Sequence, residues 1–262
     1  MSLRQRRAFL MTAISMAGVG VVALITGQLG SRTQSGGTAG EAPQAGEAAP
    51  GAPEAGGAEG SAAGAGTAGA VTADDGPIVM ISRSEWGARP PAVTAQGSGE
   101  HGYYNAVSNP NGWLQYDQPP AQVLHTLVIH HSALPLSDGP VEIQNLHMDE
   151  KNFADVGYQY LINERGQLFE GRAVNVRGAH AFGCNHGTVG ICLIGNFEEI
   201  EPTATQLRTL DALINALISA YPRITRMAAH KDCNPGVTLC PGQNLYALLP
   251  GIAERFGLLY GI

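Results

Sequence analysis

Positive charge is scarce in this sequence. Only 14% of its 262 residues are charged, and 15 Lys and Arg against 22 Asp and Glu leave a formal net charge of -7. Nucleic acids and anionic membrane surfaces are bound mainly through clustered positive charge. We therefore expect no nucleic-acid partner, and no membrane contact apart from the N-terminal segment.

Cysteine is also scarce, and two common zinc motifs are absent. The four cysteines are too few and too widely spaced for a disulfide scaffold, and no C-x-x-C pair occurs. No H-E-x-x-H occurs either, which argues against the zinc peptidases that carry this motif. All eight histidines lie between His101 and His230, so histidine ligands can come only from that part of the chain.

Residues 31–76 have no aromatic residue, and Val71 is their only large aliphatic one. Such a segment cannot bury enough apolar surface to offset the entropy lost on ordering. It is predicted to be a disordered Gly/Ala/Glu/Pro linker. The folded domain is then expected to span residues 77–262, which is long enough to bury a core.

Residues 1–30 have the features of an export signal. Arg6 and Arg7 precede an uncharged apolar stretch, an arrangement that resembles the twin-arginine signal. We expect export to the bacterial cell envelope, either the periplasm or the exterior. An ordinary secretory signal is one alternative. The stretch is also long enough to span a bilayer, so an uncleaved N-terminal anchor is the other.

Strand-like and helix-like segments interleave between residues 78 and 262. This order predicts an α/β fold with a mixed central β-sheet flanked by helices. The excursion at 95–121 carries interleaved aromatic residues, which favours a loop pinned by its aromatics over a ligand platform. The predicted helices are 140–150, 203–221 and 243–256, the last broken at Pro250. The predicted strands are 78–81, 126–132, 157–163, 167–170, which pairs back on the preceding strand as a hairpin, and 189–197, with a short one ending at residue 230.

Two strand-like segments end on histidine. Residues 126–132 (TLVIHHS) end on His130 and His131, whose side chains should point to opposite faces of a strand. Only one of them can therefore face a given cleft. Residues 226–230 (RMAAH) end on His230, and Cys240 comes later in a turn. Two imidazoles and a thiolate are sufficient ligands for a catalytic zinc.

A copper electron-transfer site is an alternative use of the same residue types. Such a site needs two histidines, a cysteine and a weak axial ligand, and Met227 could supply the last. That class of protein is all-β, whereas the capping box at 203–206 (TATQ) and the apolar spacing after it predict a helix. The copper interpretation is therefore disfavoured.

Eight segments, in the right order between residues 78 and 250, together resemble one known family. They are similar to the zinc amidases of bacteriophages and bacteria and to the peptidoglycan recognition proteins of animals. The loop at 95–121 is longer than the family minimum, and the disulfide common beside the first ligand in animal members has no counterpart. The segments are 82–88 (SRSEWGA), 129–133 (IHHSA), 155–160 (DVGYQY), 169–172 (FEGR), 178–180 (GAH), 189–191 (VGI), 195–197 (GNF) and 229–242 (AHKDCNPGVTLCPG).

The resemblance implies a metal site and a reaction. It makes His130, His230 and Cys240 the ligands of Zn²⁺ in a peptidoglycan recognition protein-like fold. It implies that the protein is an N-acetylmuramoyl-L-alanine amidase, which cleaves the amide between N-acetylmuramic acid and L-alanine of peptidoglycan. A non-catalytic peptidoglycan-binding module is the alternative, although such members typically lack the cysteine ligand. Peptidoglycan is the expected partner, and we expect a monomer.

The resemblance also implies roles for residues around the metal. Tyr158 and Thr238 fall where the family places residues that assist catalysis, and hydroxyls there could donate to an oxyanion. His147 and His180 fall at the cleft, where substrate contact is expected. Strand alternation would place Tyr158 on one face with Tyr160 and Ile162, which makes a core tyrosine the alternative.

Two further cysteines fall near the site by the same resemblance. Cys184 and Cys233 lie in loops that it brings close to the cleft. A disulfide between them and two free thiols are both compatible with the sequence. Cys192 lies in a continuous apolar run and is interpreted as a small buried residue.

Overall fold

A seven-stranded mixed sheet organises the computed structural model, which describes residues 71–73, 76–93, 104–105 and 107–262. Neighbouring strands are parallel except for β5 and β6, which form an antiparallel hairpin. The predicted mixed α/β sheet is confirmed. In spatial order the strands are β3 (Met80–Ile81), β6 (Leu168–Glu170), β5 (Tyr160–Ile162), β7 (Thr188–Leu193), β4 (Thr126–His131), β8 (Arg226–Ala229) and β9 (Leu259–Tyr260).

The N-terminal border of the domain carries a separate hairpin. β1 (Val71–Ala73) pairs antiparallel with β2 (Gly76–Ile78), at and just before residue 77, where we expected the domain to begin. The predicted signal at 1–30 and the linker up to residue 70 lie outside the described residues.

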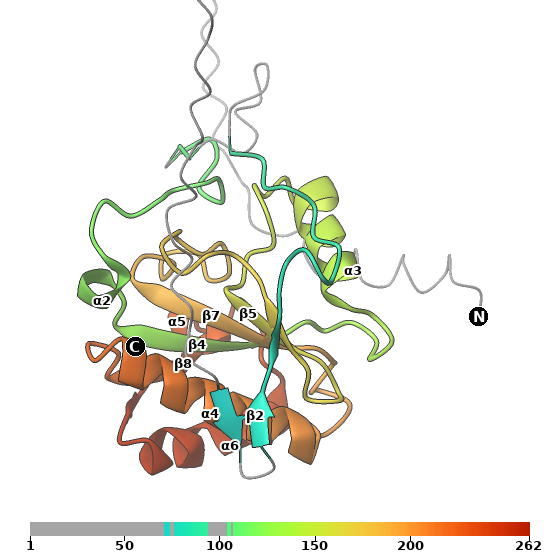
Figure 1. The fold of residues 1–262 in the computed structure, drawn as a ribbon, viewed down its shortest axis with the longest axis vertical. Helices are drawn as coiled ribbons and strands as arrows, with labels where there is room; N and C mark the ends of the chain where they lie inside the picture. Colours follow the sequence, from blue (N-terminus) through green and yellow to red (C-terminus); the bar gives the residue numbers. More distant parts are fainter. Residues whose placement is uncertain (1–70, 74–75, 94–103, 106) are drawn as a thin grey trace, which may run out of the picture. The chain divides into compact units, whose positions relative to one another are not determined.

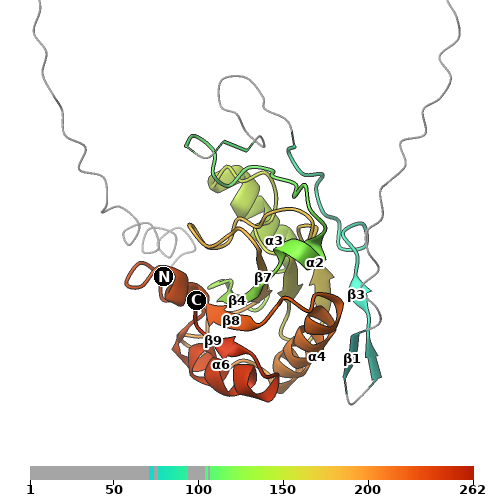
Figure 2. The ribbon, with the colours of Figure 1, turned by 90° about the vertical axis from the view of Figure 1, so that its left-hand side faces the viewer.

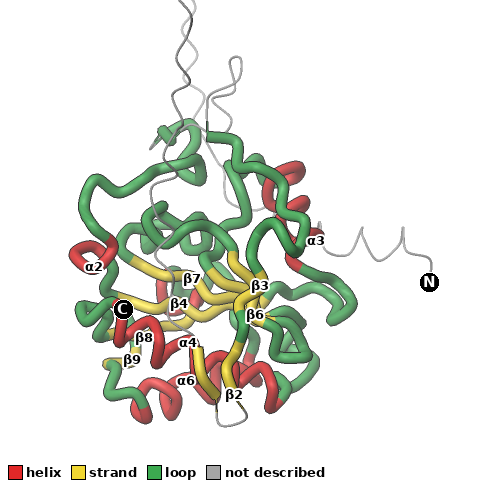
Figure 3. Tube along the Cα trace, viewed as in Figure 1, coloured by secondary structure: helices red, strands yellow, loops and turns green. Residues whose placement is uncertain are grey.

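Helices cover both faces of the sheet. α4 (Ala204–Ala220) and α6 (Gln243–Arg255) lie on one face, and α3 (Pro140–Asn145) lies on the other (Figures 1 and 2). A π-helical turn, η3 (Leu146–Glu150), continues α3. A short helix, α2 (Pro120–Val123), lies in one of the long connections drawn in Figure 3. Another, α5 (His230–Cys233), directly follows β8. Within the described residues, no helix has the length and apolarity needed to cross a membrane.

Strand alternation divides the core between these two faces. In β4, Leu127 and Ile129 pack into the large apolar cluster under α4 and α6, while His130 points to the opposite face. There a smaller cluster forms around Trp86, Ile143 and Leu161, among others. The face opposite α4 and α6 therefore has room for polar side chains at the end of β4.

A local signal sets the start of α4 as predicted. Thr203 Oγ1 accepts from the backbone N–H of Gln206 at 3.1 Å, and Gln206 Oε1 accepts from the backbone N–H of Thr203 at 3.0 Å. This reciprocal pair satisfies two donors that a helix start would otherwise leave unpaired.

The predicted break at Pro250 is wrong, because α6 continues through this residue. An internal proline costs a helix about 3 kcal/mol. On both sides of Pro250, however, Leu245, Leu249 and Ile252 are buried against the sheet. Burial of such side chains contributes roughly 1.5–3 kcal/mol each, which outweighs the local penalty.

Candidate metal centre

Three potential metal ligands converge at the carboxyl end of the central strands. One ligand atom each of His130, His230 and Cys240 lies within 4.8 Å of the others. His130 Nδ1 lies 3.6 Å from Cys240 Sγ. His130 is fully buried and Cys240 nearly so, whereas His230 is partly exposed. Of the three residues, His230 is thus the one nearest to solvent.

Strand register brings the two histidines together. β4 and β8 are adjacent and parallel, and Ile129 is paired with Ala229. The next residue along each chain segment is a ligand candidate: His130 lies in β4, and His230 is the first residue of α5. The strand predicted to end at residue 230 therefore ends one residue earlier, at Ala229. The ring centroids of the two histidines are 4.6 Å apart.

Backbone contacts hold Cys240 beside these histidines. Its carbonyl accepts from the N–H of Lys231 at 2.9 Å, and its Sγ accepts from the N–H of His131 at 3.4 Å. Gly242 then approaches β7's continuation so closely that a Cβ there would lie 2.4 Å from the carbonyl carbon of Phe197. The loop that carries Cys240 is therefore folded back onto the end of the sheet.

The side chains of His131 and Met227 face away from this centre. His131 Nδ1 accepts from the N–H of Phe197 at 3.3 Å, and Met227 is fully buried in the cluster under α4 and α6. The prediction that only one histidine of the adjacent pair faces the cleft is confirmed. A copper site with Met227 as axial ligand is excluded, because this residue lies on the other face of the sheet.

The protonation states of the three side chains suit a metal cation. Burial lowers the pKa of His130 well below its usual value and that of His230 to about 4, so both imidazoles are neutral at physiological pH. Burial raises the pKa of the Cys240 thiol to about 12. A bound divalent cation would favour its thiolate instead. Two neutral imidazoles and one thiolate are a donor set that fits zinc.

His180 contacts the ring nitrogen of His130 that does not face Cys240. His180 Nδ1 lies 3.0 Å from His130 Nε2, and His180 Nε2 lies 3.4 Å from Thr188 Oγ1. The Thr188 hydroxyl in turn donates to the carbonyl of Cys184 at 2.6 Å. If His130 uses Nδ1 for a metal, each N–H or O–H in this chain has an acceptor, and the chain fixes the His130 ring.

Two glycines make room for the His180 ring. A Cβ at Gly178 would lie 2.3 Å from His180 Cδ2, and a Cβ at Gly190 would lie 2.5 Å from the same atom. Such distances are far below van der Waals contact. The glycines of the segments 178–180 and 189–191 therefore have a physical role: without a Cβ, they leave the space that the His180 ring occupies.

We predict that His180→Ala weakens zinc binding by about 10–100-fold, the usual effect of losing a group that orients a metal-bound histidine. Competition with a chromogenic chelator measures the dissociation constant. His186→Ala is the matched control, because His186 lies on the same loop, is exposed and contacts the ring of Tyr116. Equal zinc affinity for the wild type and His180→Ala would show that the chain does not support the metal.

Tyr158 lies among the histidines and not in the main core. Its ring centroid is 5.0 Å from that of His130 and 5.3 Å from that of His147. The expectation that it shares a face with Tyr160 and Ile162 is wrong, because these two pack under α4 and α6 while Tyr158 packs against the smaller cluster. The regular strand begins only at Tyr160, so alternation does not extend back to residue 158.

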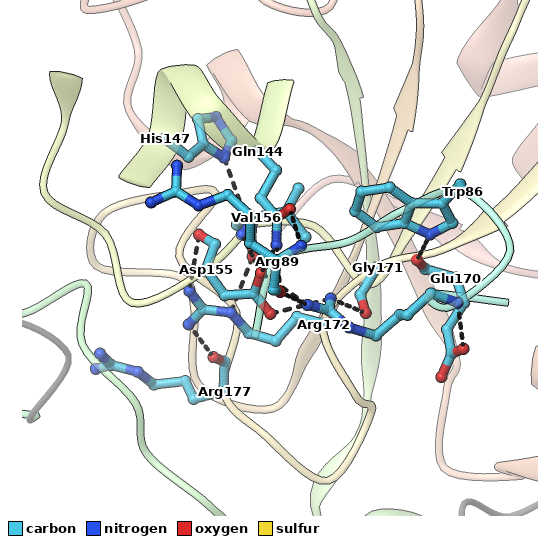
Figure 4. A network of polar contacts seen from close by, with 12 residues as sticks. Trp86, Arg89, Gln144, His147, Asp155, Val156, Glu170, Gly171, Arg172 and Arg177 are labelled. Carbon is cyan, nitrogen blue, oxygen red and sulfur yellow. Dashed lines mark hydrogen bonds and ion pairs between the residues drawn. The ribbon is translucent and has the colours of Figure 1, made fainter. Parts of the chain in front are cut away.

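A buried polar network fixes the segment that carries Tyr158 (Figure 4). The carboxylate of Asp155 forms an ion pair with Arg83 at 3.0 Å and accepts from Gln144 Nε2 at 2.7 Å. Arg172, which is almost fully buried, donates to the carbonyls of Asp155 and Val156 at 3.3 and 3.0 Å. These bonds leave the backbone before Tyr158 little freedom.

His147, His180 and Thr238 are each held by nearby polar groups. His147 is buried, and its Nδ1 accepts from the N–H of Gly157 at 2.9 Å. His180 is only 8% exposed and contacts the His130 ring. Substrate contact by these two imidazoles therefore stays a prediction. Thr238 Oγ1 accepts from the N–H of Cys240 at 3.1 Å, which leaves its hydroxyl proton available for an incoming group.

Lys151 is a charged neighbour that the sequence did not single out. Burial lowers the pKa of His147 and of His230, and the Lys151 ammonium lowers both further; it also offsets part of the rise that burial causes in the pKa of Cys240. The residue comes directly after η3, and nothing in its sequence context distinguishes it from a solvated lysine. Only the position of η3 beside the site brings its charge there.

The aromatic residues of the long excursion pin it to the domain, as favoured from the sequence. Trp113 stacks on the guanidinium of Arg172 at 5.7 Å, and Tyr104 on that of Arg177 at 4.1 Å. The Tyr116 hydroxyl accepts from the N–H of Gly187 at 3.0 Å. Residues 94–103 and 106 of this excursion lie outside the described part of the chain.

Known proteins share both the sequence and the fold. The sequence model of the family described as N-acetylmuramoyl-L-alanine amidase matches residues 119–243. Peptidoglycan-recognition protein SD of Drosophila melanogaster is 30% identical over 186 residues, which cover 68% of this chain and 87% of that protein. The structure of Drosophila PGRP-LB is 27% identical, with a TM-score of 0.53 over 70% of this chain and 96% of its own.

A third similar protein was solved with a ligand. Peptidoglycan recognition protein-LE, in complex with tracheal cytotoxin, a monomeric diaminopimelic acid-type peptidoglycan, is 26% identical, with a TM-score of 0.53 over 69% of this chain and 95% of its own.

The fold and the site define an α/β protein with a largely buried His-His-Cys cluster at the carboxyl ends of adjacent parallel strands. The similarity to peptidoglycan-recognition protein SD extends over most of both chains. The chain belongs to the family of peptidoglycan recognition proteins and N-acetylmuramoyl-L-alanine amidases.

Proposed function

We propose that this protein hydrolyses the amide between N-acetylmuramic acid and L-alanine of peptidoglycan, with zinc held by His130, His230 and Cys240. The observation that carries the proposal is the convergence of these three donors within 4.8 Å in a chain of this family. Bound zinc would polarise the scissile carbonyl and lower the pKa of water towards neutrality.

The surrounding residues would orient the ligands and receive developing charge. His180 would keep the His130 ring in one orientation through its 3.0 Å contact. Tyr158 and Thr238 would donate hydroxyl protons to the oxyanion that forms as the amide is attacked. Burial raises the pKa of Tyr158 well above its usual value, so its hydroxyl keeps the proton that this role requires.

Peptidoglycan is the proposed partner, and the cell envelope is the proposed location. The complex of the LE relative with a monomeric peptidoglycan supports the ligand class. The twin-arginine-like segment at Arg6 and Arg7 supports export. A polymer or a fragment could each supply the scissile amide.

The test is product analysis on intact sacculi. The zinc-loaded full chain is incubated with purified sacculi, and the soluble fraction is analysed by mass spectrometry. An amidase releases stem peptides with a free L-alanine amino group and leaves muramic acid with a free lactyl carboxylate. A non-catalytic binding module would sediment with the sacculi and release neither product, which would overturn the proposed reaction while keeping the ligand.

A further inference from the structure

Two cysteines outside the metal centre lie near each other in two loops. Both Cys184 and Cys233 are partly exposed, and the nearby Cys184 thiol adds to burial in raising the pKa of Cys233. A hydrogen bond joins the same loops one or two residues away, because Asn234 Nδ2 donates to the carbonyl of Phe182 at 2.8 Å. The proximity of the thiols is therefore supported by the backbone around them.

Each of these cysteines is connected to a different ligand histidine, one through a chain of polar contacts and the other through a short helix. The carbonyl of Cys184 accepts from Thr188 and so ends the polar chain that begins at His130. Cys233 is the last residue of α5, and His230 is the first. A covalent bond between the two cysteines would thus join the loop that ends the His130 polar chain to the helix that begins at His230.

The other two cysteines are placed differently. Cys192 is fully buried in β7, and Cys240 Sγ faces His130 Nδ1 in the proposed metal centre. Pairing of Cys184 with Cys233 therefore consumes neither the buried thiol nor the ligand thiol. Once paired with Cys184, Cys233 is also no longer available to form a disulfide with Cys240.

We propose that Cys184 and Cys233 form a disulfide that links the loop supporting His130 to the helix carrying His230. In this step the two thiols lose two protons and two electrons, and one S–S bond forms. The electrons pass to an oxidised dithiol of the thiol–disulfide exchange class, whose own S–S bond is reduced to two thiols. Export, as expected from the N-terminal segment, would bring the chain to a compartment where such oxidants operate.

The disulfide should stabilise the domain, because it closes a long chain segment and restricts the unfolded state. It should also restrict the two loops that carry the exposed side chains of Phe182, Val237 and Leu239. Neither effect depends on amide hydrolysis, so an experiment can contradict the proposed disulfide without contradicting the proposed function, and the reverse.

The experiment uses the full chain with zinc present, oxidised with glutathione disulfide. Free thiols are alkylated under denaturing conditions, and proteolytic peptides are mapped by mass spectrometry. We expect one linked peptide pair containing Cys184 and Cys233, with Cys192 and Cys240 alkylated. Recovery of Cys184 and Cys233 as alkylated thiols, or a link between Cys233 and Cys240, would overturn the assignment.

Thermal unfolding provides the second readout. The oxidised wild type is expected to melt roughly 5–15 °C higher than the same protein treated with a phosphine reductant. A Cys184→Ser, Cys233→Ser double variant should melt near the reduced wild type and show no response to reductant. The single Cys184→Ala variant serves if the double variant does not fold. A reductant response in either variant as large as that of the wild type would assign the shift to other cysteines.

Discussion

Replacing His130 by alanine is expected to remove the bound zinc and to reduce amide hydrolysis to background. The variant keeps only His230 and Cys240 as donors, and it leaves His180 Nδ1 without its 3.0 Å partner. Cys240→Ser should have the same result, because a serine hydroxyl does not provide a thiolate. Metal analysis after dialysis should show about one zinc per chain for the wild type and nearly none for either variant.

His131→Ala is the matched control for this prediction. His131 is the adjacent histidine, but its ring contacts the backbone of Phe197 on the other face of the strand. Its loss should cost on the order of 1 kcal/mol of stability, from one unpaired N–H, and should leave the zinc content unchanged. Full zinc in His130→Ala together with zinc loss in His131→Ala would reverse the ligand assignment.

Tyr158→Phe is expected to lower turnover by roughly 10²–10³-fold, the cost of removing one oxyanion donor. The change deletes only the hydroxyl and keeps the ring between the imidazoles of His130 and His147. Zinc content, melting temperature and substrate binding should change little, because the donated hydrogen bond forms mainly in the transition state.

Tyr160→Phe is the matched control, because it removes the hydroxyl of a core tyrosine away from the metal centre. Tyr160 lies two residues away but packs under α4 and α6, so its hydroxyl cannot reach the metal centre. This variant should keep wild-type turnover, and any effect should fall on the melting temperature. A stable, zinc-loaded Tyr158→Phe protein that turns over like the wild type would end the catalytic assignment of Tyr158.

The sequence predicts features that depend on a few neighbouring residues. The capping box at Thr203 and Gln206 sets the start of α4 by bonds within one turn. The opposite orientation of His130 and His131 results from the period of a strand alone. Both are local effects, and the structure confirms both.

Features that depend on distant segments could not be predicted in the same way. The contact of His180 with His130 needs room provided by Gly190 on another strand, and no local pattern indicates it. Tyr158 departs from strand alternation because the network around Asp155 and Arg172 holds the chain before β5 begins. Pro250 stays helical because tertiary burial exceeds its local penalty.

The separation of the ligands along the chain links metal binding to folding. His130 Nδ1 and Cys240 Sγ are 3.6 Å apart in space but 110 residues apart in sequence. A half-folded chain, in which β8 has not yet docked beside β4, therefore holds no preformed centre. By thermodynamic linkage, a cation that binds only the folded domain raises its melting temperature as the free metal concentration rises. Zinc scarcity would then make the domain easier to unfold and digest, so the supply of metal would set the lifetime of the protein.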